Sequence, residues 1–450
     1  MTASRPVVRF GTDGLRGRWG QPPLDADTLR RVAAAFGVSL QRAGSEHKRV
    51  LLGHDGRRSA PAILQAMVDG LTAADVACTD AGLLTTPALA NLVRDEGFAG
   101  GVMVSASHNP ASDNGVKLFD ATGGKIADEV EREIEELAVR IDAEDRVARG
   151  RARPRHELVQ RYEDRLRNVF PDLDLTGLKI AVDASNGGGS EIAPRLLRLF
   201  GAEVVATACT PDGDNINAGV GALHPEVLAG VVRAEGAMFG VCLDGDGDRG
   251  VFVDETGAVH DGDAVLAALA PWLDRTGALP HRTVVATVMS NLGLRRALAR
   301  HDIALVTTPV GDRHVVQAMR AGGYGLGGEQ SGHIVFAGPG RHTGDGLFTA
   351  LMLLAMRQAE GKGFAELFAG FTRYPQALVN VAVRSKPPLG DLPAVQRAVQ
   401  EVESALGDDG RVLVRYSGTE DVCRVMVEGP REDDVRRHAE HIAAALRASL

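Results

Sequence analysis

The sequence has few cysteines and no long apolar run. Its 450 residues include only four cysteines, which lie far apart and form no C-x-x-C pair: Cys78, Cys209, Cys242 and Cys423. In a chain of this size, isolated cysteines indicate reduced core residues of a cytosolic protein. No run of about 18 apolar residues could cross a bilayer, and the first residues, "MTASRPVVRFG", lack the apolar segment of a signal peptide. We therefore expect a cytoplasmic protein without a membrane partner.

The sequence also lacks an excess of positive charge. Its net charge is −9 and its pI is near 5.8, so non-specific binding to nucleic acid or anionic membrane is not expected. The basic segment 146–156 has no interleaved aromatic residues and is typical of a linker. Any phosphate that this chain binds must be met by local basic residues.

Composition and patterning predict a multidomain α/β protein. Strand-like and helix-like segments alternate through most of the chain, which indicates βαβ units. The tail differs, because segments 376–385 and 411–418 alternate like half-exposed strands and 431–449 is an amphipathic helix pattern. We expect three tandem α/β domains with mixed sheets, at 1–155, 156–256 and 257–370. A C-terminal α+β domain at 371–450 would complete a central active-site cleft.

The stretch "GVMVSASHNPASDNGVKLFD", residues 101–120, places hydroxyls where a buried strand ends. Ser107 and His108 follow the strand, Pro110 stiffens the loop, and Asn114-Gly115 predicts a turn. A Ser–His hydrolase is disfavoured because the G-x-S-x-G elbow is absent. Two interpretations stay open: a polar loop whose hydroxyls cap a helix, and a serine that carries a phosphoryl group beside a metal.

A second stretch, "CLDGDGDRGVFVDETG" at 242–257, sets Asp244, Asp246 and Asp248 between glycines after an apolar strand. Three carboxylates this close repel one another unless a cation lies among them, and oxygen ligands favour Mg²⁺ or Ca²⁺. An EF-hand is rejected because Arg249 stands at the sixth position, where that loop needs glycine. An acidic turn without metal is the alternative. The guanidinium of Arg249 suits an anion shared with the metal, which points to phosphoryl transfer.

Two weaker signals receive structural interpretations. Arg57 and Arg58, in "GHDGRR" at 53–58, are expected to form a strand-to-helix turn rather than to contact an anion. The glycines of "NGGGS" at 186–190 lack the G-x-G-x-x-G spacing of a dinucleotide loop.

Taken together, these motifs resemble the α-D-phosphohexomutase family. The resemblance spans the chain and rests on five segments in the family's order: "FGTDGLRG" (10–17), "SASHNPASDNGVK" (105–117), "DGDGDR" (244–249), "GGEQSGH" (327–333) and "RYSGTEDVCR" (415–424). "MSNLG" (289–293), "VGDR" (310–313), "HTGDG" (342–346) and Gln330 are most similar to the bacterial phosphoglucosamine mutase branch.

The resemblance implies a role for each matching residue. Ser107 would be the phosphoserine, and its phosphate would complete the metal shell of Asp244, Asp246 and Asp248. The residues around the transferring phosphoryl group would be Arg16, His108, Lys117 and Arg249, with His333 assisting proton transfer. Glu329 and Ser331 would bind sugar hydroxyls, and the non-reacting phosphate would be held by Arg415, Ser417, Gly418, Thr419 and Arg424. The last loop departs from the family pattern at Asp421, where proline is usual, and at Tyr416, where lysine is frequent.

The implied activity interconverts glucosamine 6-phosphate and glucosamine 1-phosphate, which feeds UDP-N-acetylglucosamine and cell-wall precursor synthesis. The implied cofactors are one Mg²⁺ per active site and glucosamine or glucose 1,6-bisphosphate as activator and intermediate. The partner is a small phosphosugar, and the oligomeric state, a homodimer included, is left open. Two alternatives remain: a phosphomannomutase or phosphoglucomutase on the same scaffold, and a sugar-phosphate sensor without catalysis.

Overall fold

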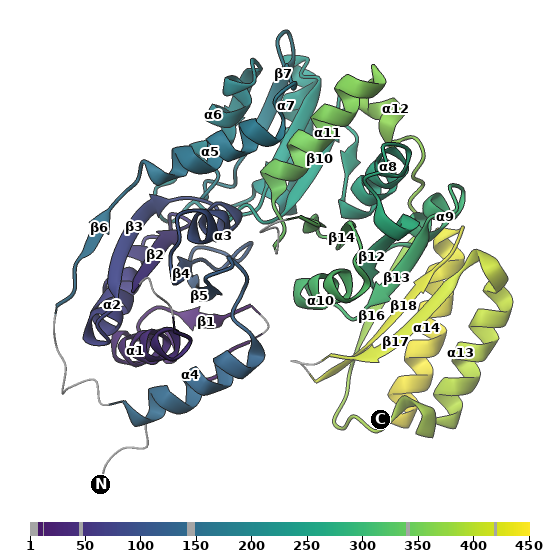
Figure 1. The fold of residues 1–450 in the computed structure, drawn as a ribbon. Helices are drawn as coiled ribbons and strands as arrows, with labels where there is room; N and C mark the ends of the chain where they lie inside the picture. Colours follow the sequence, from purple (N-terminus) through teal and green to yellow (C-terminus); the bar gives the residue numbers. More distant parts are fainter. Residues whose placement is uncertain (1–7, 12, 45–47, 142–148, 339–342, 418–420) are drawn as a thin grey trace. The chain divides into compact units, whose positions relative to one another are not determined.

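The computed structural model describes residues 8–11, 13–44, 48–141, 149–338, 343–417 and 421–450. The chain separates into two compact units, drawn in Figure 1. Unit 1 comprises Met1–Val288 and Val306–Phe368, and unit 2 comprises Met289–Leu305 and Ala369–Leu450. Unit 1 contains mixed sheets with helices and unit 2 an antiparallel sheet with helices, which confirms the predicted fold class. The four domain boundaries stay a prediction.

The first sheet of unit 1 has the strand order β1-β5-β4-β2-β3-β6. Its strands are β1 (Leu15–Arg18), β2 (Arg49–His54), β3 (Ala77–Leu83), β4 (Gly100–Val104), β5 (Asp113–Asp120) and β6 (Ala152–Pro154). The helices of this segment are α1 (Ala26–Arg42), α2 (Ala60–Ala73), α3 (Thr86–Asp95) and α4 (Asp128–Arg140). The inner strands pair in parallel, whereas β5 runs antiparallel to both β4 and β1.

The second sheet has the order β11-β10-β9-β7-β8, and the third has the order β13-β12-β14-β15. The strands of the second are β7 (Lys179–Asp183), β8 (Glu203–Thr207), β9 (Phe239–Leu243), β10 (Gly250–Asp254) and β11 (Val259–His260). Those of the third are β12 (Thr283–Thr287), β13 (Ala304–Thr308), β14 (Leu326–Gly328) and β15 (Ile334–Phe336). The accompanying helices are α5 (Leu158–Val169), α6 (Ile192–Leu199), α7 (Pro225–Glu235), α8 (Gly262–Arg275), α10 (Asp312–Gly322), α11 (Gly346–Glu360) and α12 (Phe364–Phe368).

Unit 2 is built on the antiparallel sheet β16-β18-β17. Its elements are β16 (Gln376–Ala382), β17 (Arg411–Tyr416), β18 (Val422–Glu428), α9 (Leu292–Ala299), α13 (Pro393–Leu406) and α14 (Glu432–Ser449). Its core includes Val381 and Val425 of the sheet and Ile442 and Leu446 of α14. The predicted antiparallel sheet and amphipathic last helix are confirmed.

Each predicted site loop connects two antiparallel strands that are neighbours in a sheet. The serine loop joins β4 to β5, the metal loop joins β9 to β10, the sugar loop joins β14 to β15, and the last loop joins β17 to β18. Strands β4, β9, β14 and β15 are buried along their whole length, so the serine, metal and sugar loops each start from a fixed point in a core.

One sequence-based expectation was wrong. The predicted turn at Asn114-Gly115 lies inside β5, where these residues pair with Gly17 and Arg16 of β1. The turn preference of Asn-Gly is therefore overridden by a strand that pairs on both edges. The linker predicted at 146–156 stays a prediction; within it, β6 pairs in parallel with β3 at the sheet edge.

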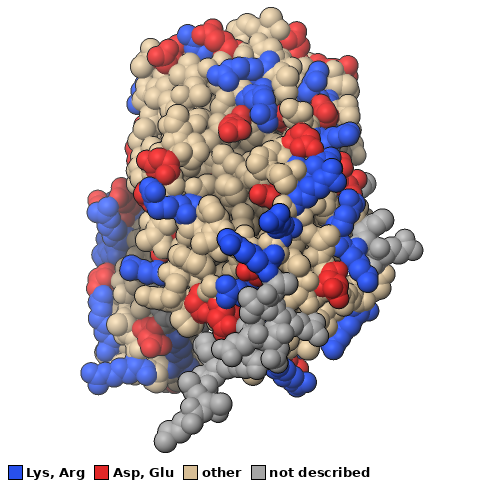
Figure 2. Space-filling view, turned by 90° about the vertical axis from the view of Figure 1, so that its left-hand side faces the viewer, with Lys and Arg blue, Asp and Glu red and all other residues tan. Residues whose placement is uncertain are grey.

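None of the described helices has the length and apolar character needed to cross a membrane. The four cysteines are free, and all but the half-buried Cys209 are buried. Basic and acidic side chains are interspersed over the face shown in Figure 2. A mixture of this kind gives a weak net field across that face.

Candidate active site

Ser107 lies at the start of the serine loop, buried beneath the metal loop. Its hydroxyl donates to Asp244 Oδ2 at 2.6 Å and lies 3.3 Å from His108 Nδ1. Its backbone N–H donates to Ser105 Oγ at 2.8 Å, which occupies the neighbouring hydroxyl. The φ angle of Ser107 is +50°, a conformation that L residues other than glycine adopt seldom. The loop therefore holds one hydroxyl, in a strained geometry, against a carboxylate.

The three aspartates of the metal loop converge as predicted. Asp244, Asp246 and Asp248 are buried, and one carboxylate oxygen of each lies within 4.8 Å of the others. Burial and the charges of Asp248 and Asp246 raise the pKa of Asp244 well above its usual value. Burial opposes the charge of Asp246 as well, but Lys117 holds its pKa below the usual range. A buried cluster with this much negative charge requires compensation by a cation.

The donor set fits a divalent metal of the hard class. Oδ1 of Asp246 and Oδ1 of Asp248 are buried and have no hydrogen-bond partner among the described residues. Native proteins rarely leave buried oxygens unpaired unless an ion or water satisfies them. Carboxylate oxygens are the ligands that Mg²⁺ and Ca²⁺ prefer, so these three residues can hold such an ion.

Lys117, on β5, contacts the same carboxylates from the other side. Its Nζ donates to Asp246 Oδ2 at 2.8 Å and to Asp248 Oδ2 at 3.4 Å, and it lies 3.1 Å from Asp13 Oδ2. Although burial disfavours its charge, these three acids raise the pKa of Lys117 well above its usual value. The predicted Arg16 joins this network through Asp13, since its Nη2 lies 2.5 Å from Asp13 Oδ2.

Arg249 adds positive potential near the serine and near His108. Although burial opposes its charge, Asp244 and Asp248 raise the pKa of Arg249. Burial lowers the pKa of His108, and the charges of Arg249 and Arg16 lower it further. Two permanent positive charges, those of Arg249 and Arg16, therefore act on the imidazole beside Ser107. Such a surrounding suits a phosphoryl group.

The sugar loop lies directly against the metal loop, because the Gly250 N–H donates to the Gly332 carbonyl at 3.0 Å. Glu329 accepts from the Gly311 N–H at 3.1 Å, while Ser331 is exposed. His333 is buried; its Nε2 accepts from the Gly344 N–H at 3.1 Å, and its Nδ1 has no hydrogen-bond partner among the described residues.

Two residues that contact this network of aspartates and Lys117 were not predicted from the sequence. Thr86, in the first turn of α3, donates its hydroxyl to Asp246 Oδ2 and its N–H to the Asp246 carbonyl at 2.8 Å. Asp13 bridges Arg16 and Lys117 and also binds Lys125 Nζ at 2.5 Å. Asp13 lies within the "FGTDGLRG" motif, which offered a signal, whereas nothing in the sequence connects Thr86 with residues 160 positions later.

The two weaker sequence signals have structural roles around these loops. Gly188 donates its N–H to the Gly245 carbonyl at 2.8 Å, and a Cβ on Gly187 would lie 2.1 Å from that oxygen. The glycines of 186–190 therefore allow the metal loop to pack closely on them. Arg57, in the turn between β2 and α2, is buried and pairs with Asp55 Oδ2 at 2.9 Å, which agrees with the predicted structural turn.

In unit 2, Arg415 and Arg424 face each other as a directly paired couple on β17 and β18. Burial lowers the pKa of Arg415, and the charge of Arg424 lowers it further. Like charges directly opposite on neighbouring strands destabilise a sheet unless an anion joins them. Ser417 donates its N–H to the Val422 carbonyl at 2.9 Å, while Gly418 and Thr419 lie outside the described residues.

Asp421 and Tyr416 are the two departures from the family pattern in this loop. Asp421 is exposed and pairs with Lys386 Nζ at 3.3 Å, and its carbonyl accepts from the Val383 N–H at 2.9 Å. The hydroxyl of Tyr416 is buried without a hydrogen-bond partner among the described residues, and burial raises its pKa. Neither departure removes Arg415 or Arg424.

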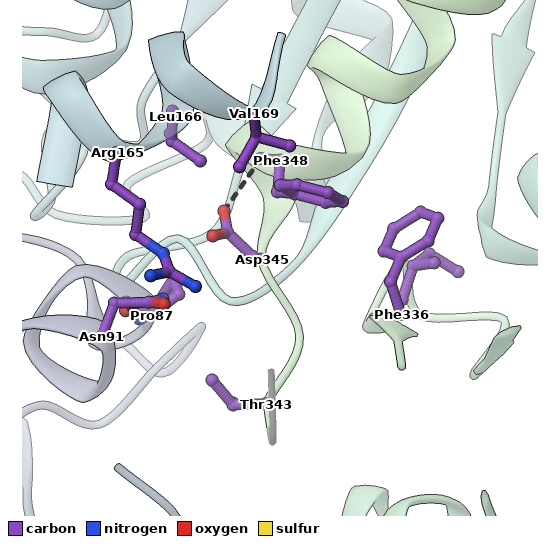
Figure 3. Close-up of a pocket in the computed structure, with 10 residues that line it drawn as sticks. Pro87, Asn91, Arg165, Leu166, Val169, Phe336, Thr343, Asp345 and Phe348 are labelled. Atoms are coloured by element: carbon purple, nitrogen blue, oxygen red, sulfur yellow. Dashed lines mark hydrogen bonds between the residues drawn. The ribbon is translucent and has the colours of Figure 1, made fainter. Parts of the chain in front are cut away.

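A separate cavity of unit 1 is too small for a sugar phosphate. It has a volume of about 20 Å³ and lies among α3, α5, β15 and the start of α11 (Figure 3). Its lining includes Asn91, Arg165 and Phe336, and Asp345, whose Oδ1 accepts from the Phe348 N–H at 2.9 Å. A space of this size holds about one water molecule, so it carries no substrate.

Four family models match the chain, in order along its length. They are the phosphoglucomutase/phosphomannomutase alpha/beta/alpha domains I, II and III, at residues 7–145, 160–257 and 261–374, and the C-terminal domain at 378–445. A phosphoglucosamine mutase of Anaeromyxobacter sp. is 44% identical, with 100% of this chain and 98% of that protein aligned. A phosphoglucosamine mutase of Saccharopolyspora erythraea is 46% identical, with 98% and 99% aligned.

Solved structures share the fold. A phosphoglucomutase/phosphomannomutase family protein of Burkholderia thailandensis is similar with a TM-score of 0.78 and 26% identity, over 97% of both chains. An N-acetylphosphoglucosamine mutase of Aspergillus fumigatus, solved in complex with GlcNAc-6P and magnesium, has a TM-score of 0.67 over 99% of this chain and 97% of its own. At 20% identity, the second likeness shows the fold alone.

Proposed function

The chain belongs to the phosphoglucomutase/phosphomannomutase family, and we propose that within it the chain acts as an isomerase that interconverts glucosamine 6-phosphate and glucosamine 1-phosphate. One observation carries the proposal: the Ser107 hydroxyl lies 2.6 Å from Asp244, within a buried triad of carboxylates. A hydroxyl that carries a phosphoryl group needs a cation beside it to offset the added negative charge.

The reaction consists of two phosphoryl transfers. In the first, the bond between phosphorus and Ser107 Oγ breaks as a bond forms to O1 of glucosamine 6-phosphate, which gives the 1,6-bisphosphate. The proton of the sugar hydroxyl passes to a base, for which His333 is the candidate, and Ser107 Oγ regains a proton. In the second transfer the bond between phosphorus and O6 breaks as a bond forms to Ser107 Oγ. Ser107 Oγ gives up its proton, O6 takes one up, and glucosamine 1-phosphate leaves.

The roles of the surrounding residues follow from charge. Arg249, Arg16 and His108 would bind the equatorial oxygens of the phosphoryl group, whose negative charge is spread over them in the transition state. Lys117 holds Asp246 and Asp248 in place through its two contacts. Glu329 and Ser331 would accept and donate hydrogen bonds with sugar hydroxyls.

The three aspartates would hold one Mg²⁺ per site, together with a phosphate oxygen on Ser107. When bound, the ion supplies positive charge that lowers the energy of the transferring phosphoryl group. The unpaired Oδ1 atoms of Asp246 and Asp248 support this assignment.

Unit 2 would hold the phosphate that is not reacting. Arg415 and Arg424 stand directly opposite each other on β17 and β18. Ser417, Gly418 and Thr419 would add hydroxyl and N–H donors. An exchange of the two phosphates between the serine and this loop requires the bisphosphate to turn over without leaving. The cytoplasmic location stays a prediction, and a homodimer stays an open option.

A coupled assay of the purified protein tests the proposal. Glucosamine 6-phosphate, Mg²⁺ and a catalytic amount of glucose 1,6-bisphosphate should yield glucosamine 1-phosphate at a rate well above those for glucose or mannose phosphates. Faster turnover of glucose or mannose phosphates would instead identify a phosphoglucomutase or phosphomannomutase. A protein that gains no phosphate in intact-mass analysis after incubation with the bisphosphate would be a sensor rather than a mutase.

A further inference from the structure

Arg57 uses four of its five side-chain donors to hold the serine loop and the fifth to bind Asp55. Its Nε donates to Asp55 Oδ2 at 2.9 Å. One terminal nitrogen donates to the carbonyls of Pro110 and Asp113, the second of these at 2.8 Å. The other terminal nitrogen donates to the carbonyls of Ser107 at 3.1 Å and Asn109 at 2.9 Å. A guanidinium has five N–H donors in a rigid plane, and the four carbonyls and one carboxylate account for all five.

Asn217 contacts two of the same carbonyls from a segment far away in the sequence. Its Nδ2 donates to the carbonyl of Ser107 and to the carbonyl of Asn109, each at 2.9 Å. A carbonyl oxygen accepts through two lone pairs. The carbonyls of Ser107 and Asn109 therefore each have one donor from Arg57 and one from Asn217.

The backbone of the metal loop packs against the Ser107 carbonyl and the Asn217 side chain. A Cβ on Gly245 would lie 2.6 Å from the Ser107 carbonyl and 2.9 Å from Asn217 Nδ2. The carbonyl of the nucleophile is thus enclosed by Arg57, Asn217 and the backbone of the metal loop. Because Ser107 has a φ of +50°, its conformation persists only where the surroundings hold it.

We propose that Arg57 and Asn217 are positioning residues that fix the backbone of Ser107 and so keep its hydroxyl aimed at the metal triad. The inference rests on the proposed function, since it takes Ser107 to be the nucleophile. Neither residue is among those proposed to bind the metal or the substrate. They act through the carbonyls of the serine loop, and a displacement of about 1 Å at a reacting group costs on the order of a hundredfold in rate.

Two substitutions test the proposal, each with a matched control. Arg57→Lys keeps the charge but replaces a planar fork with an ammonium that cannot reach four carbonyls. Asn217→Asp keeps the shape and tolerates the positive φ of 57° at this position, but turns the donor into an acceptor that faces two oxygens. The controls are Arg58→Lys, because Arg58 is exposed and pairs with Asp214, and Asn215→Asp, because Asn215 Nδ2 donates to the Thr210 carbonyl instead.

With the Mg²⁺-loaded enzyme, each test variant should lose about a hundredfold in kcat while KM stays close to that of the wild type. Both controls should keep kcat. A rise in KM without loss of kcat, or equal kcat in test and control variants, would overturn the proposal. If Arg57→Lys fails to fold, Asn217→Asp alone decides the matter, because its side chain is only partly buried in a surface segment.

A second measurement does not depend on mutase activity. Hydrogen–deuterium exchange of peptides that span residues 104–115 should accelerate in both test variants, while exchange in β7 and β9 is unchanged. A uniform acceleration throughout unit 1 would mean a merely structural role and would overturn the proposal. A wild-type protein without mutase activity would refute the proposed function, and the exchange experiment would still report whether the two residues fix this loop.

Discussion

At the scale of single residues, the site combines a strained hydroxyl with more negative charge than its neighbours neutralise. Lys117 reaches Asp246 and Asp248 but not Asp244, whose oxygens accept instead from Ser107 Oγ and the Arg249 N–H. The group with the raised pKa is thus the one beside the nucleophile. This placement favours a cation between Asp244 and a phosphorylated Ser107.

Ser107→Ala should abolish mutase activity and leave the fold intact. The neighbouring hydroxyl of Ser105 accepts the Ser107 N–H, whereas the Ser107 hydroxyl is the one that contacts Asp244. After incubation with glucose 1,6-bisphosphate, intact mass should show one added phosphate on the wild type and none on the variant. Phosphopeptide mapping that places the phosphate on Ser105 would contradict the assignment.

Asp246→Asn should lower kcat by a hundredfold or more. Charge stabilisation by a bound metal is worth several kcal/mol in phosphoryl transfer, and about 1.4 kcal/mol corresponds to a factor of ten. The exposed Asp214, changed to Asn, is the control, and its activity should stay normal. EDTA should inactivate the wild type and added Mg²⁺ should restore it. An unchanged rate in EDTA would remove the metal from the reaction.

The sequence reveals those site residues that stand together in one motif. Asp244, Asp246, Asp248 and Ser107 could be assigned because spacing and chemistry were visible within two short segments. Thr86 and Asn217 could not, because their contacts depend on how segments more than 100 residues apart pack. Arg57 was predicted as a turn residue, and only the structure shows which carbonyls its donors reach.

At the scale of elements, each of the four predicted site loops connects the two strands of a β-hairpin. The alternation of strands and helices predicted parallel-leaning sheets, but the loops with the chemistry lie where each sheet turns antiparallel. A sequence pattern reports burial of a strand and not its direction, which is why β5, β10 and β15 were not anticipated. Short connections between buried strands fix the loops more closely than βα crossovers of greater length would.

Gly245→Ala should destabilise the protein and slow the reaction together. The added methyl group would overlap the Ser107 carbonyl, and overpacking of this kind costs about 1–3 kcal/mol. Gly230→Ala is the matched control, because it lies on the exposed face of α7 with no atom near its Cβ and should stabilise by about 0.5–1 kcal/mol. Thermal unfolding and kcat of both variants check this. Equal melting temperatures would mean that the two loops do not touch.

At the scale of the whole molecule, the residues proposed for the chemistry and those proposed for the second phosphate belong to different compact units. Ser107, the metal triad and the sugar loop are all in unit 1, whereas Arg415 and Arg424 are in unit 2. Segment 289–305 belongs to unit 2, where Asn291 Nδ2 donates to the buried Glu428 at 3.0 Å and to the Tyr374 carbonyl at 3.0 Å. The "MSNLG" motif therefore ties this segment to the rest of unit 2.

Arg415→Ala separates phosphate binding from chemistry. If the pair with Arg424 holds the non-reacting phosphate, its loss should raise KM and let more bisphosphate escape, because that phosphate orients the reacting end. Phosphorylation of Ser107 by glucose 1,6-bisphosphate should persist, since the machinery of unit 1 is unchanged. Stability should not fall, because the change removes a like-charge pair from a sheet.

The control is Arg436→Ala on α14, an exposed arginine that pairs with Glu432 and should leave KM and leakage normal. Substrate kinetics, bisphosphate released per turnover and the melting temperature together decide between two origins of a defect. A rise in KM with a normal melting temperature assigns the arginine pair to phosphate. A fall in melting temperature with unchanged KM would mean that Arg415 stabilises the sheet of unit 2, and the second phosphate would then have to be bound elsewhere.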